Sequence, residues 1–577
     1  MPLDLVIRGG VVVDGTGLAR RRADVGIEAG RIAAIGHVGT KGAARVIDAD
    51  GLVVAPGIID LHTHYDPQLT FDPFATSSCY HGVTSVLAGN CGFSIAPTRR
   101  ADRRFTQALF AVVEGMAPVA LDGVTWEFES FPEYLAARRG RLGVNLACYV
   151  GHSSLRRFVM GAAASEREAR DDEIAEMRRL VREAVAAGAA GFSSSHAPTQ
   201  LDGDGRPVAS RFASREELLA LVEEAGRAGA GSVAYLPKSV IGGLDAADEQ
   251  LLIDLALASR TKIVIQGLGG RDKTDTPGAG WDRAQAFLAE AAAKGAAIFS
   301  LLRNHPFDRP IDLAKGTPLY AGVEAWHALM ALPPEEKLAR LRDPEVRARM
   351  RDAVEHPNRD PARGSTLPPP HWDVVFIDET TEPRHAKHLR RSIAELAAEL
   401  GKAPADVLLD LALESRLATK FRWENRTPRW EASVRESLHH PAMLIGVSDG
   451  GAHLDRDDGA DWSSFFLRFW VLERGAFTLE EGIRQLTQVP AALAGLAGRG
   501  VLLPGAKADV MLFDPARVGP GTKRIVHDLP GGEGRFLARP HGFVATLVNG
   551  VPIVEDGKLT GALPGEVLRP LAPEDAT

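Results

Sequence analysis

The sequence predicts an α/β protein that combines an eight-stranded parallel barrel of (β/α)8 type with a small β-sandwich domain built from both chain ends. Three observations support this prediction. Apolar runs alternate with helical patterns through the middle of the chain, strand patterns occupy both ends, and 45% of the 577 residues are hydrophobic. A chain of this length exceeds one ordinary domain core, so two domains are expected.

The barrel prediction rests on eight short apolar runs in the central part of the chain. Helical patterns separate several of them, as at 171–187 and 214–228, and this alternation is typical of a parallel barrel. A doubly wound open sheet is the alternative, which is less favoured because no GxGxxG fingerprint follows any run. The eight runs are 57–62, 83–87, 144–150, 191–194, 231–235, 262–265, 296–302 and 442–447.

Strand patterns fill the first part of the chain and return in its last part. The final one, at 544–550, ends in Asn549-Gly550, which is a strong signal for a hairpin turn. We therefore predict a β-sandwich from residues 1–55 together with 500–577, and a barrel at 56–499.

A long interval, at about 305–440, separates the last two predicted barrel strands. It carries a charged helical stretch at 334–356, a Pro-rich turn at 366–370 and a second helical stretch at 386–400. We predict that it is an insertion. Segments at the carboxyl end of a barrel often carry lids and specificity elements, so the insertion either helps to close the site or packs against the outside of the barrel.

The charge balance limits the partners of the protein. The chain has 67 basic and 75 acidic residues, a formal net charge of −8, which disfavours nucleic acid and anionic membranes as partners. We expect a small-molecule substrate. The sequence leaves open whether the chain forms a homo-oligomer.

Cysteine usage and the amino terminus indicate the compartment. Cys79, Cys91 and Cys148 have no CxxC spacing, which disfavours a disulfide framework and favours a reducing environment. The chain begins with a strand pattern instead of a charged and then apolar leader, and no stretch reaches the roughly 18 apolar residues of a spanning helix. We therefore expect a cytoplasmic protein.

Two histidines, His62 and His64, follow the first barrel run. Residues two apart in an extended strand face the same side, so both imidazoles are expected to point into the barrel at its carboxyl end and to bind one metal ion. Histidines of this spacing also occur in solvent-exposed loops. The apolar run before this pair favours the metal site.

Several motifs, spread over nearly the whole chain, resemble those of the amidohydrolase superfamily in the branch of N-acyl-D-amino-acid deacylases (D-aminoacylases). They are PGIIDLHTHYD at 56–66, GVTSV at 82–86, GNCG at 89–92, VGH at 150–152, LR at 155–156, GFS at 191–193, VSDG at 447–450 and KADV at 507–510. The resemblance implies a distorted TIM barrel flanked by a β-sandwich from both chain ends. It also implies a hydrolase of amide C–N bonds that uses Zn²⁺, as one or two divalent metal ions.

The resemblance assigns roles to Cys91 and Asp449. It implies that Cys91 supplies a thiolate ligand, which suits Zn²⁺, although free cysteine is more commonly a small buried core residue. Asp449 matches the aspartate that follows the eighth barrel strand, and is implied to bind metal and to act as general base and acid. The alternative for Asp449 is a carboxylate that caps a turn.

Two histidines of the family pattern are absent from this chain. The family places them at the ends of the fifth and sixth barrel strands, where this sequence reads YLPK at 235–238 and IQGL at 265–268. Lys238 is a candidate replacement, as a carbamylated ligand or as a cation that binds a substrate carboxylate, and a surface lysine is the alternative. The family's His-Pro-Arg stretch also has no counterpart after Asp449.

Four more residues are candidates for the substrate pocket. His196 and His305 follow the fourth and seventh strands, at the barrel end where active sites lie, although exposed loop histidines are the alternative. His152 and Arg156 lie in a stretch that matches the family, and a histidine near a metal commonly contacts substrate or a metal ligand.

These observations predict a metal-dependent amidohydrolase that acts on an N-acyl amino acid or a related amide. A metal-activated water attacks the carbonyl, and Asp449 takes up and returns the proton. One alternative is a cyclic amide or imide hydrolase, or a deaminase, because one fold hosts several reactions. The other is a non-catalytic scaffold that has lost part of the metal site.

Overall fold

The computed structural model describes residues 3–239, 244–268, 281–306, 308–314, 320, 323–330, 332–356, 371–424, 426, 428–454 and 459–570. The chain divides into two compact units. The larger unit contains residues 1–271, 278–305 and 434–577, and the smaller one contains 272–277 and 306–433.

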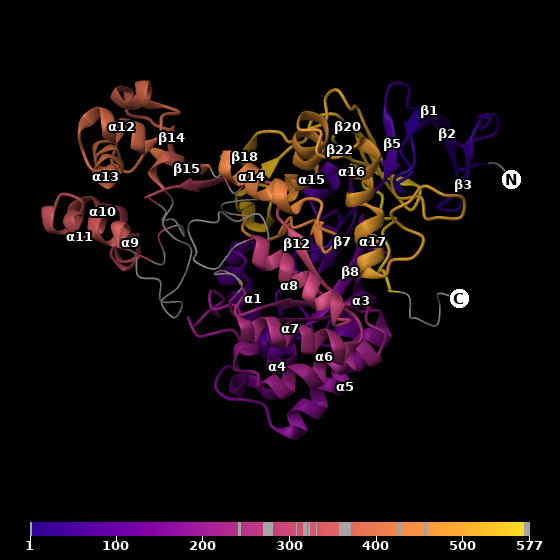
Figure 1. Cartoon of the computed structure of the whole chain (residues 1–577), viewed down its shortest axis with the longest axis horizontal. Helices are drawn as coiled ribbons and strands as arrows, with labels where there is room; N and C mark the ends of the chain where they lie inside the picture. Colours follow the sequence, from indigo (N-terminus) through magenta and orange to yellow (C-terminus); the bar gives the residue numbers. More distant parts are fainter. Residues whose placement is uncertain are drawn as a thin grey trace. The chain divides into compact units, whose positions relative to one another are not determined.

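Eight parallel strands form the centre of the larger unit (Figure 1). Their hydrogen-bonded order is β16-β12-β11-β10-β9-β8-β7-β6, which is sequence order read backwards. The strands are β6 (Ile58–Asp60), β7 (Val83–Ala88), β8 (Asn145–Gly151), β9 (Gly191–Ser195), β10 (Ser232–Leu236), β11 (Lys262–Gln266), β12 (Ile298–Leu302) and β16 (Met443–Ile445). The predicted distorted TIM barrel is confirmed.

The first and last strands meet just beyond their ends. Thr63 and Gly450 form an isolated parallel bridge, and the amide of His64 donates to the carbonyl of Gly450 at 2.8 Å. The first strand is shorter than expected, because its register with β7 shifts between Ile58 and Ile59 and the chain after Asp60 turns toward Gly450 instead of continuing as a strand.

Alternation along the strands decides which residues point into the barrel. Ala234, Val264 and Leu301 belong to one buried hydrophobic cluster. Ala234 is paired with Val264, and Gln266 is paired with Leu301. Because strand residues two apart face the same side, the inward-facing residue at the end of β11 is Gln266.

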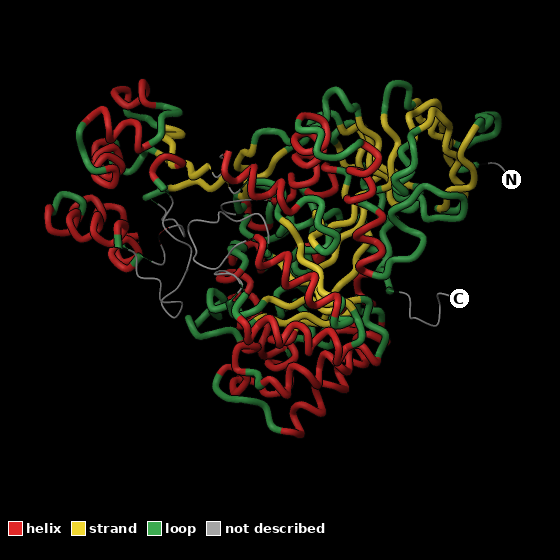
Figure 2. Tube along the Cα trace, viewed as in Figure 1, coloured by secondary structure: helices red, strands yellow, loops and turns green. Residues whose placement is uncertain are grey.

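Helices cover the outside of the barrel. Figure 2 shows them as a red layer beside the yellow strands. Their ends follow from local sequence: the Ser214 side chain caps the start of α6 by accepting from the Glu217 amide, and α5 ends at Gly188, whose φ is 118°. These helices are α4 (His152–Met160), α5 (Asp171–Ala187), α6 (Arg215–Arg227), α7 (Ala246–Ser259) and α8 (Trp281–Ala293).

Other elements of the larger unit lie in the loops and toward the end of the chain. They are α1 (Arg103–Val113), α2 (Pro118–Leu121), α3 (Phe131–Arg138), α15 (Trp462–Phe465), a π-helical segment (Phe466–Glu473), α16 (Leu479–Leu486), α17 (Gln488–Ala494), β18 (Lys523–Val526) and β19 (Arg535–Ala538).

Both chain ends contribute to one nine-stranded sheet, in which β5 pairs antiparallel with β17. The two ends therefore lie side by side, indigo and yellow, in Figure 1. Asn549 and Gly550, with φ of 47° and 81°, form the hairpin turn that the sequence predicts. The strands are β1 (Leu5–Val12), β2 (Arg21–Glu28), β3 (Arg31–Gly36), β4 (Arg45–Asp48), β5 (Val53–Pro56), β17 (Val510–Phe513), β20 (Phe543–Val548), β21 (Val551–Glu555) and β22 (Lys558–Leu559).

The smaller unit has a hydrophobic core of its own, which includes Trp326, Leu341, Ile393, Leu408 and Phe421. Its elements are β13 (Asp308–Ile311), β14 (Val375–Glu379), β15 (Lys420–Glu424), α9 (Glu324–Met330), α10 (Pro334–Arg340), α11 (Pro344–Glu355), α12 (Ile393–Leu400) and α13 (Pro404–Glu414), and α14 (Pro428–Ser437) runs across its last residues. Across the described part of the chain, no helix combines the length and apolar character that crossing a membrane requires.

A buried polar network joins the barrel to the nine-stranded sheet. Arg499 forms an ion pair with Asp509, and both side chains are almost completely buried. Asp509 also accepts hydrogen bonds from the Asn145 side chain at the start of β8, at 3.2 Å, and from the backbone of Asn549, at 2.9 Å. One carboxylate therefore fixes residues from three separate segments.

We expect Asp509→Ala to lower the free energy of unfolding by about 1 to 3 kcal/mol, because it leaves buried donors of Arg499 and Asn145 without their acceptor, while Arg499 keeps its ion pair with Glu566 at 2.8 Å. Urea denaturation followed by circular dichroism measures the loss. Asp48→Ala is the control, because Asp48 pairs with Arg8 on the exposed surface, where ion pairs contribute little. Equal effects of the two substitutions would contradict the structural role of the network.

Candidate metal centre

His62 and His64 lie immediately after β6 and are almost completely buried. Their backbone is held by the last strand of the barrel. The Asp449 amide donates to the carbonyl of His62 at 3.1 Å, and the His64 amide donates to the carbonyl of Gly450 at 2.8 Å. Closure of the barrel therefore brings Asp449 to the two histidines.

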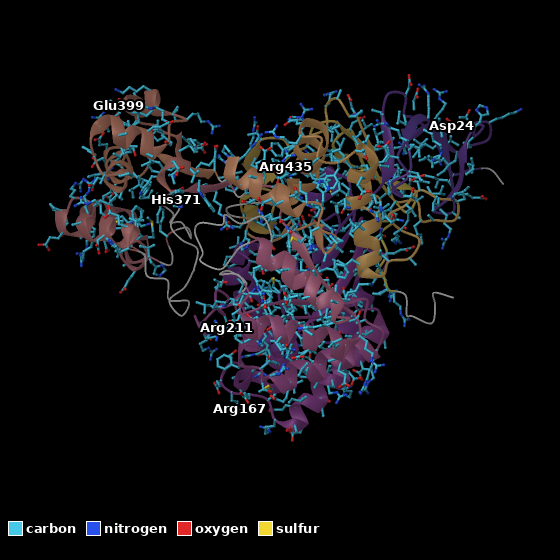
Figure 3. The ribbon with its side chains drawn as sticks, viewed as in Figure 1. Asp24, Arg167, Arg211, His371, Glu399 and Arg435 are labelled. Carbon is cyan, nitrogen blue, oxygen red and sulfur yellow. The ribbon has the colours of Figure 1, made fainter. Side chains whose placement is uncertain are left out.

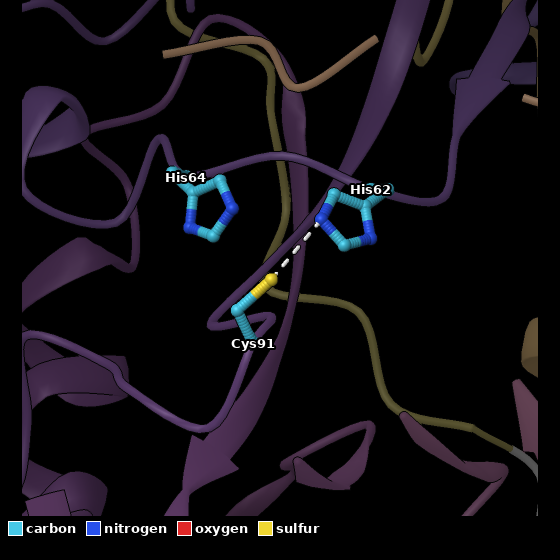
Figure 4. A group of neighbouring side chains, drawn as sticks. All are labelled: His62, His64 and Cys91. Carbon is cyan, nitrogen blue, oxygen red and sulfur yellow. Dashed lines mark hydrogen bonds between the residues drawn. The ribbon is translucent and has the colours of Figure 1, made fainter. Parts of the chain in front are cut away.

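Four donor atoms converge at this point. The Oδ1 atom of Asp449 lies 3.4 Å from Nε2 of His62 and 3.5 Å from Nε2 of His64. The Sγ atom of Cys91 lies 3.6 Å from Nε2 of His62, as the dashed line in Figure 4 shows. The structure thus brings together all four residues that the sequence indicated as metal ligands.

The turn after β7 aims Cys91 at the histidines. Cys91 has a φ of 57°, in the left-handed region that non-glycine residues rarely adopt. Asn90 stabilises the turn by donating to the carbonyl oxygens of Thr63 and Leu87, at 3.3 and 2.9 Å. The following residue, Gly92, approaches the backbone of β9 so closely that a Cβ atom would lie 2.9 Å from the Ser195 nitrogen.

Asp449 also adopts a left-handed conformation, with a φ of 60°. Next to it, the Ser448 hydroxyl donates to the carbonyl of His62 at 3.1 Å and accepts from the Gly450 amide at 2.7 Å. Burial by itself raises the pKa of Asp449, but hydrogen bonding to His62 and His64, together with charge from His62 and His453, outweighs burial and holds the pKa well below its usual value. The carboxylate is therefore ionised.

The donor set fits a divalent metal ion. Around a tetrahedral ion with bonds of about 2.0 to 2.3 Å, neighbouring donor atoms stand roughly 3.3 to 3.8 Å apart, which matches the three distances above. His62, His64 and Cys91 are the mutually close group, and Asp449 joins it through the two histidines. Burial lowers the pKa of His64, so its imidazole is in the neutral form that binds metals. Burial also raises the pKa of the Cys91 thiol well above its usual value, and a bound cation is the kind of group that stabilises a thiolate there.

Glu114, which sequence reasoning missed, lies on the other side of His64. It is 3% exposed, and its Oε1 atom is 3.4 Å from Nδ1 of His64. A carboxylate in this position commonly orients a metal-binding histidine. Glu114 follows α1, away from every barrel strand, so no strand-end pattern could have indicated it.

His453 and Asp60 were also missed. The amide of His453 donates to the carbonyl of Glu114, and its Nε2 atom lies 3.8 Å from Oδ2 of Asp449. Asp60, completely buried at the end of β6, accepts from the indole of Trp462 at 3.1 Å. Burial raises the pKa of Asp60 to about 7.

Three other predicted residues lie at the carboxyl ends of barrel strands. Lys238 is exposed. His196 accepts or donates a hydrogen bond at Nδ1 with the hydroxyl of Tyr235, at 2.7 Å. His305 is 3% exposed, and its Nε2 atom lies 3.5 Å from the point where a Cβ atom on Gly459 would stand.

His152 and Arg156 belong to a separate cluster behind the barrel wall. His152 contacts Ser194 at 2.8 Å and Glu217 at 2.9 Å, and Arg156 pairs with the same carboxylate. Arg156 also donates to the carbonyl of Arg167, whose side chain is labelled at the lower surface in Figure 3. His152, Arg156 and Glu217 are 0% exposed, so these contacts are internal to the protein.

Comparison with known proteins agrees with this geometry. The model described as the Amidohydrolase family matches residues 45–361. The chain is 32% identical to a D-aminoacylase of Alcaligenes xylosoxydans xylosoxydans over 98% of both chains. A solved D-aminoacylase, described as having a binuclear metal centre with one-metal activation and second-metal attenuation, is 26% identical, with a TM-score of 0.61 over 98% of this chain and 100% of the other.

A further solved structure supports the fold alone. It is an N-acyl-D-glutamate deacylase from Bordetella bronchiseptica, complexed with zinc and a phosphonate inhibitor. It is 24% identical, with a TM-score of 0.64, and the match covers 99% of this chain and 100% of the other.

The fold and these relatives define the class of protein as a barrel hydrolase that depends on metal. The chain belongs to the amidohydrolase family, in the branch that contains the D-aminoacylases. The family resemblance inferred from the sequence motifs is therefore confirmed.

The cluster around Glu217 gives a test of the predicted roles of His152 and Arg156. We expect Arg156→Met to lower the free energy of unfolding, by about 3 to 5 kcal/mol, because it leaves the Glu217 carboxylate buried without its guanidinium. The KM for a hydrolysed substrate should not change. A raised KM with unaltered stability would instead assign Arg156 to substrate binding.

Proposed function

We propose that this chain hydrolyses the amide bond of N-acyl amino acids with the aid of a divalent metal ion held by His62, His64, Cys91 and Asp449. The observation that carries the proposal is the convergence of two imidazole nitrogens, a thiol and a carboxylate oxygen at 3.4 to 3.6 Å. The similarity to a D-aminoacylase over nearly the whole chain supports the N-acyl-D-amino acid class of substrate.

Zn²⁺ is the proposed ion, because thiolate and imidazole are ligands that it favours. When bound, such an ion polarises the substrate carbonyl and lowers the pKa of water to about 7. Hydrogen bonds hold the ligand segments in place around the metal position. The carbonyl oxygen of His62 accepts from both the Ser448 hydroxyl and the Asp449 amide, which fixes the histidine segment against the aspartate segment.

Asp449 is proposed to move the proton. Its Oδ1 atom faces the two histidines, whereas Oδ2 faces His453. Because the carboxylate is ionised, Oδ2 is able to accept a proton from the attacking water and to return it to the leaving nitrogen. His453 lies on the side of the carboxylate where that proton would be held.

Glu114 is proposed as a positioning residue that acts through His64. The Glu114 carboxylate lies 3.4 Å from Nδ1, a contact that does not form a hydrogen bond in this structure, and its charge favours the tautomer that carries hydrogen on Nδ1 and leaves the lone pair of Nε2 directed at Asp449 and the metal position. The two ring nitrogens of His64 therefore have distinct tasks.

The relatives favour this proposal over hydrolysis of a cyclic amide or imide and over a non-catalytic scaffold. A scaffold would also gain nothing from two left-handed residues and an ionised carboxylate buried at one point, because such features destabilise a fold. The predicted cytoplasmic location remains a proposal, which the absence of disulfides among Cys79, Cys91 and Cys148 supports.

Asp449→Asn is expected to lower kcat/KM for an N-acyl-D-amino acid by about 10²- to 10⁴-fold, since the amide cannot accept the proton. Release of free amino acid measures turnover, and metal analysis shows whether the ion is still bound. Asp171→Asn, on the exposed first turn of α5, is the matched control. Normal turnover by the Asp449 variant would overturn the assigned mechanism.

Glu114→Gln is expected to weaken metal binding by roughly 10- to 100-fold, because His64 loses the carboxylate that orients it. Competition with a chromophoric chelator measures the affinity. Glu176→Gln, an exposed substitution on α5, should leave the affinity unchanged. If both variants bind metal as tightly as the natural protein, Glu114 has no positioning role.

A further inference from the structure

The ends of β10 and β11 stand next to the candidate metal centre. Leu236 and Gln266 line a small cavity together with His62, Asn90 and Cys91. Leu236 lies two residues beyond Ala234, and Gln266 lies two residues beyond Val264, so both continue the inward-facing rows of the barrel. From these positions a strand-end side chain reaches toward the metal.

Neither residue is suited to bind zinc. Leu236 has no donor atom, and Gln266 offers only a neutral amide oxygen, whereas zinc in proteins is bound by thiolate, imidazole or carboxylate. Lys238, the other candidate at the end of β10, is exposed and does not line the cavity.

The described residues contain one group of metal-type donors and no second group. In the described ranges, the atoms of His62, His64 and Cys91 lie within 4.8 Å of one another, Asp449 contacts both histidines, and elsewhere no three histidine, cysteine or acidic residues come as close together. A solved D-aminoacylase, in contrast, is described as having a binuclear metal centre.

We propose that this chain binds a single divalent metal ion, at His62, His64, Cys91 and Asp449, and that the described residues beside it form no second metal site. The inference rests on the proposed function for the existence of the first site. It goes beyond that function because it states that the ends of β10 and β11 supply no metal ligand.

Charge supports a single ion. Metal ions in two-metal sites stand about 3.5 to 4 Å apart, and their mutual repulsion has to be offset by several anionic or imidazole ligands. Besides His62 and Cys91, the cavity wall offers apolar side chains, the phenol of Tyr235 and the two neutral amides of Asn90 and Gln266. A second cation would share Cys91 with the first and gain no ionised ligand from β10 or β11.

The cavity is better suited to a hydrogen-bond donor than to a cation. The Oε1 atom of Gln266 is buried and has no hydrogen-bond partner among the described residues. An acceptor of this kind takes a hydrogen bond from an N–H or O–H group.

Metal stoichiometry tests the proposal directly. The purified full chain is stripped with a chelator, reconstituted with excess Zn²⁺, freed of unbound metal and analysed by mass spectrometry. We expect about one equivalent per chain. The double variant His62→Asn/His64→Asn should retain almost none, whereas a chain with an independent second site would keep about one equivalent.

A second variant restores the proposed missing ligands. Leu236→His/Gln266→His should raise the bound metal from one equivalent to two, and reconstitution with Mn²⁺ should then give the spin-coupled paramagnetic resonance signal of a metal pair. Leu236→Asn/Gln266→Asn is the matched control, which should stay at one equivalent and give an uncoupled signal.

Two equivalents in the natural chain, or one equivalent left after loss of both histidines, would overturn the inference while leaving the proposed hydrolysis intact. Failure of the proposed function has a different signature. One equivalent would still be bound, but hydrolysis of N-acyl-D-amino acids would be unaffected by Asp449→Asn. The measurement on the natural chain decides the question even if the double histidine variant does not fold.

Discussion

The pairing of the segments after β6 and β16 is the interaction on which the candidate site depends. Two backbone hydrogen bonds, from Asp449 to His62 and from His64 to Gly450, join the first and last strands of the barrel. They close the barrel and place two imidazoles beside a carboxylate from the distant end of the chain. Cys91, in the turn after β7, and Glu114, directly after α1, lie next to this junction of the first and last strands.

The clustering of these donors costs free energy when no cation is bound. It holds an ionised Asp449 whose side chain is only 14% exposed, and both Asp449 and Cys91 adopt left-handed conformations that cost of order 1 to 3 kcal/mol each. A divalent ion at the proposed site would offset the clustering of the donors, because it would interact favourably with them. The backbone hydrogen bonds that close the barrel hold the two segments together.

Along a barrel strand, the residues that pack the core differ from those that face the candidate site. Ala234, Val264 and Leu301 form an apolar layer that packs the interior, while the next inward positions, among them Leu236 and Gln266, face the site. Substitution at these upper positions changes the ligands available to a metal without removing any part of the core. This is how a member of the family could retain the fold and the first metal position while losing the second.

The sequence by itself determined the eight strands, the Asn549-Gly550 turn and the His62 and His64 pair, because alternation, turn residues and strand-end motifs are local signals that act over a few residues. Cys91 and Asp449 were indicated by the resemblance to the family. The sequence did not indicate Glu114, His453 or the contact between Asp60 and Trp462. It also predicted that His152 and Arg156 line a substrate pocket, whereas both contact Glu217 behind the barrel wall. Only the tertiary structure decided these contacts, because they join side chains on loops and helices far apart in sequence, whose proximity depends on how the barrel closes and on which buried charges need a partner.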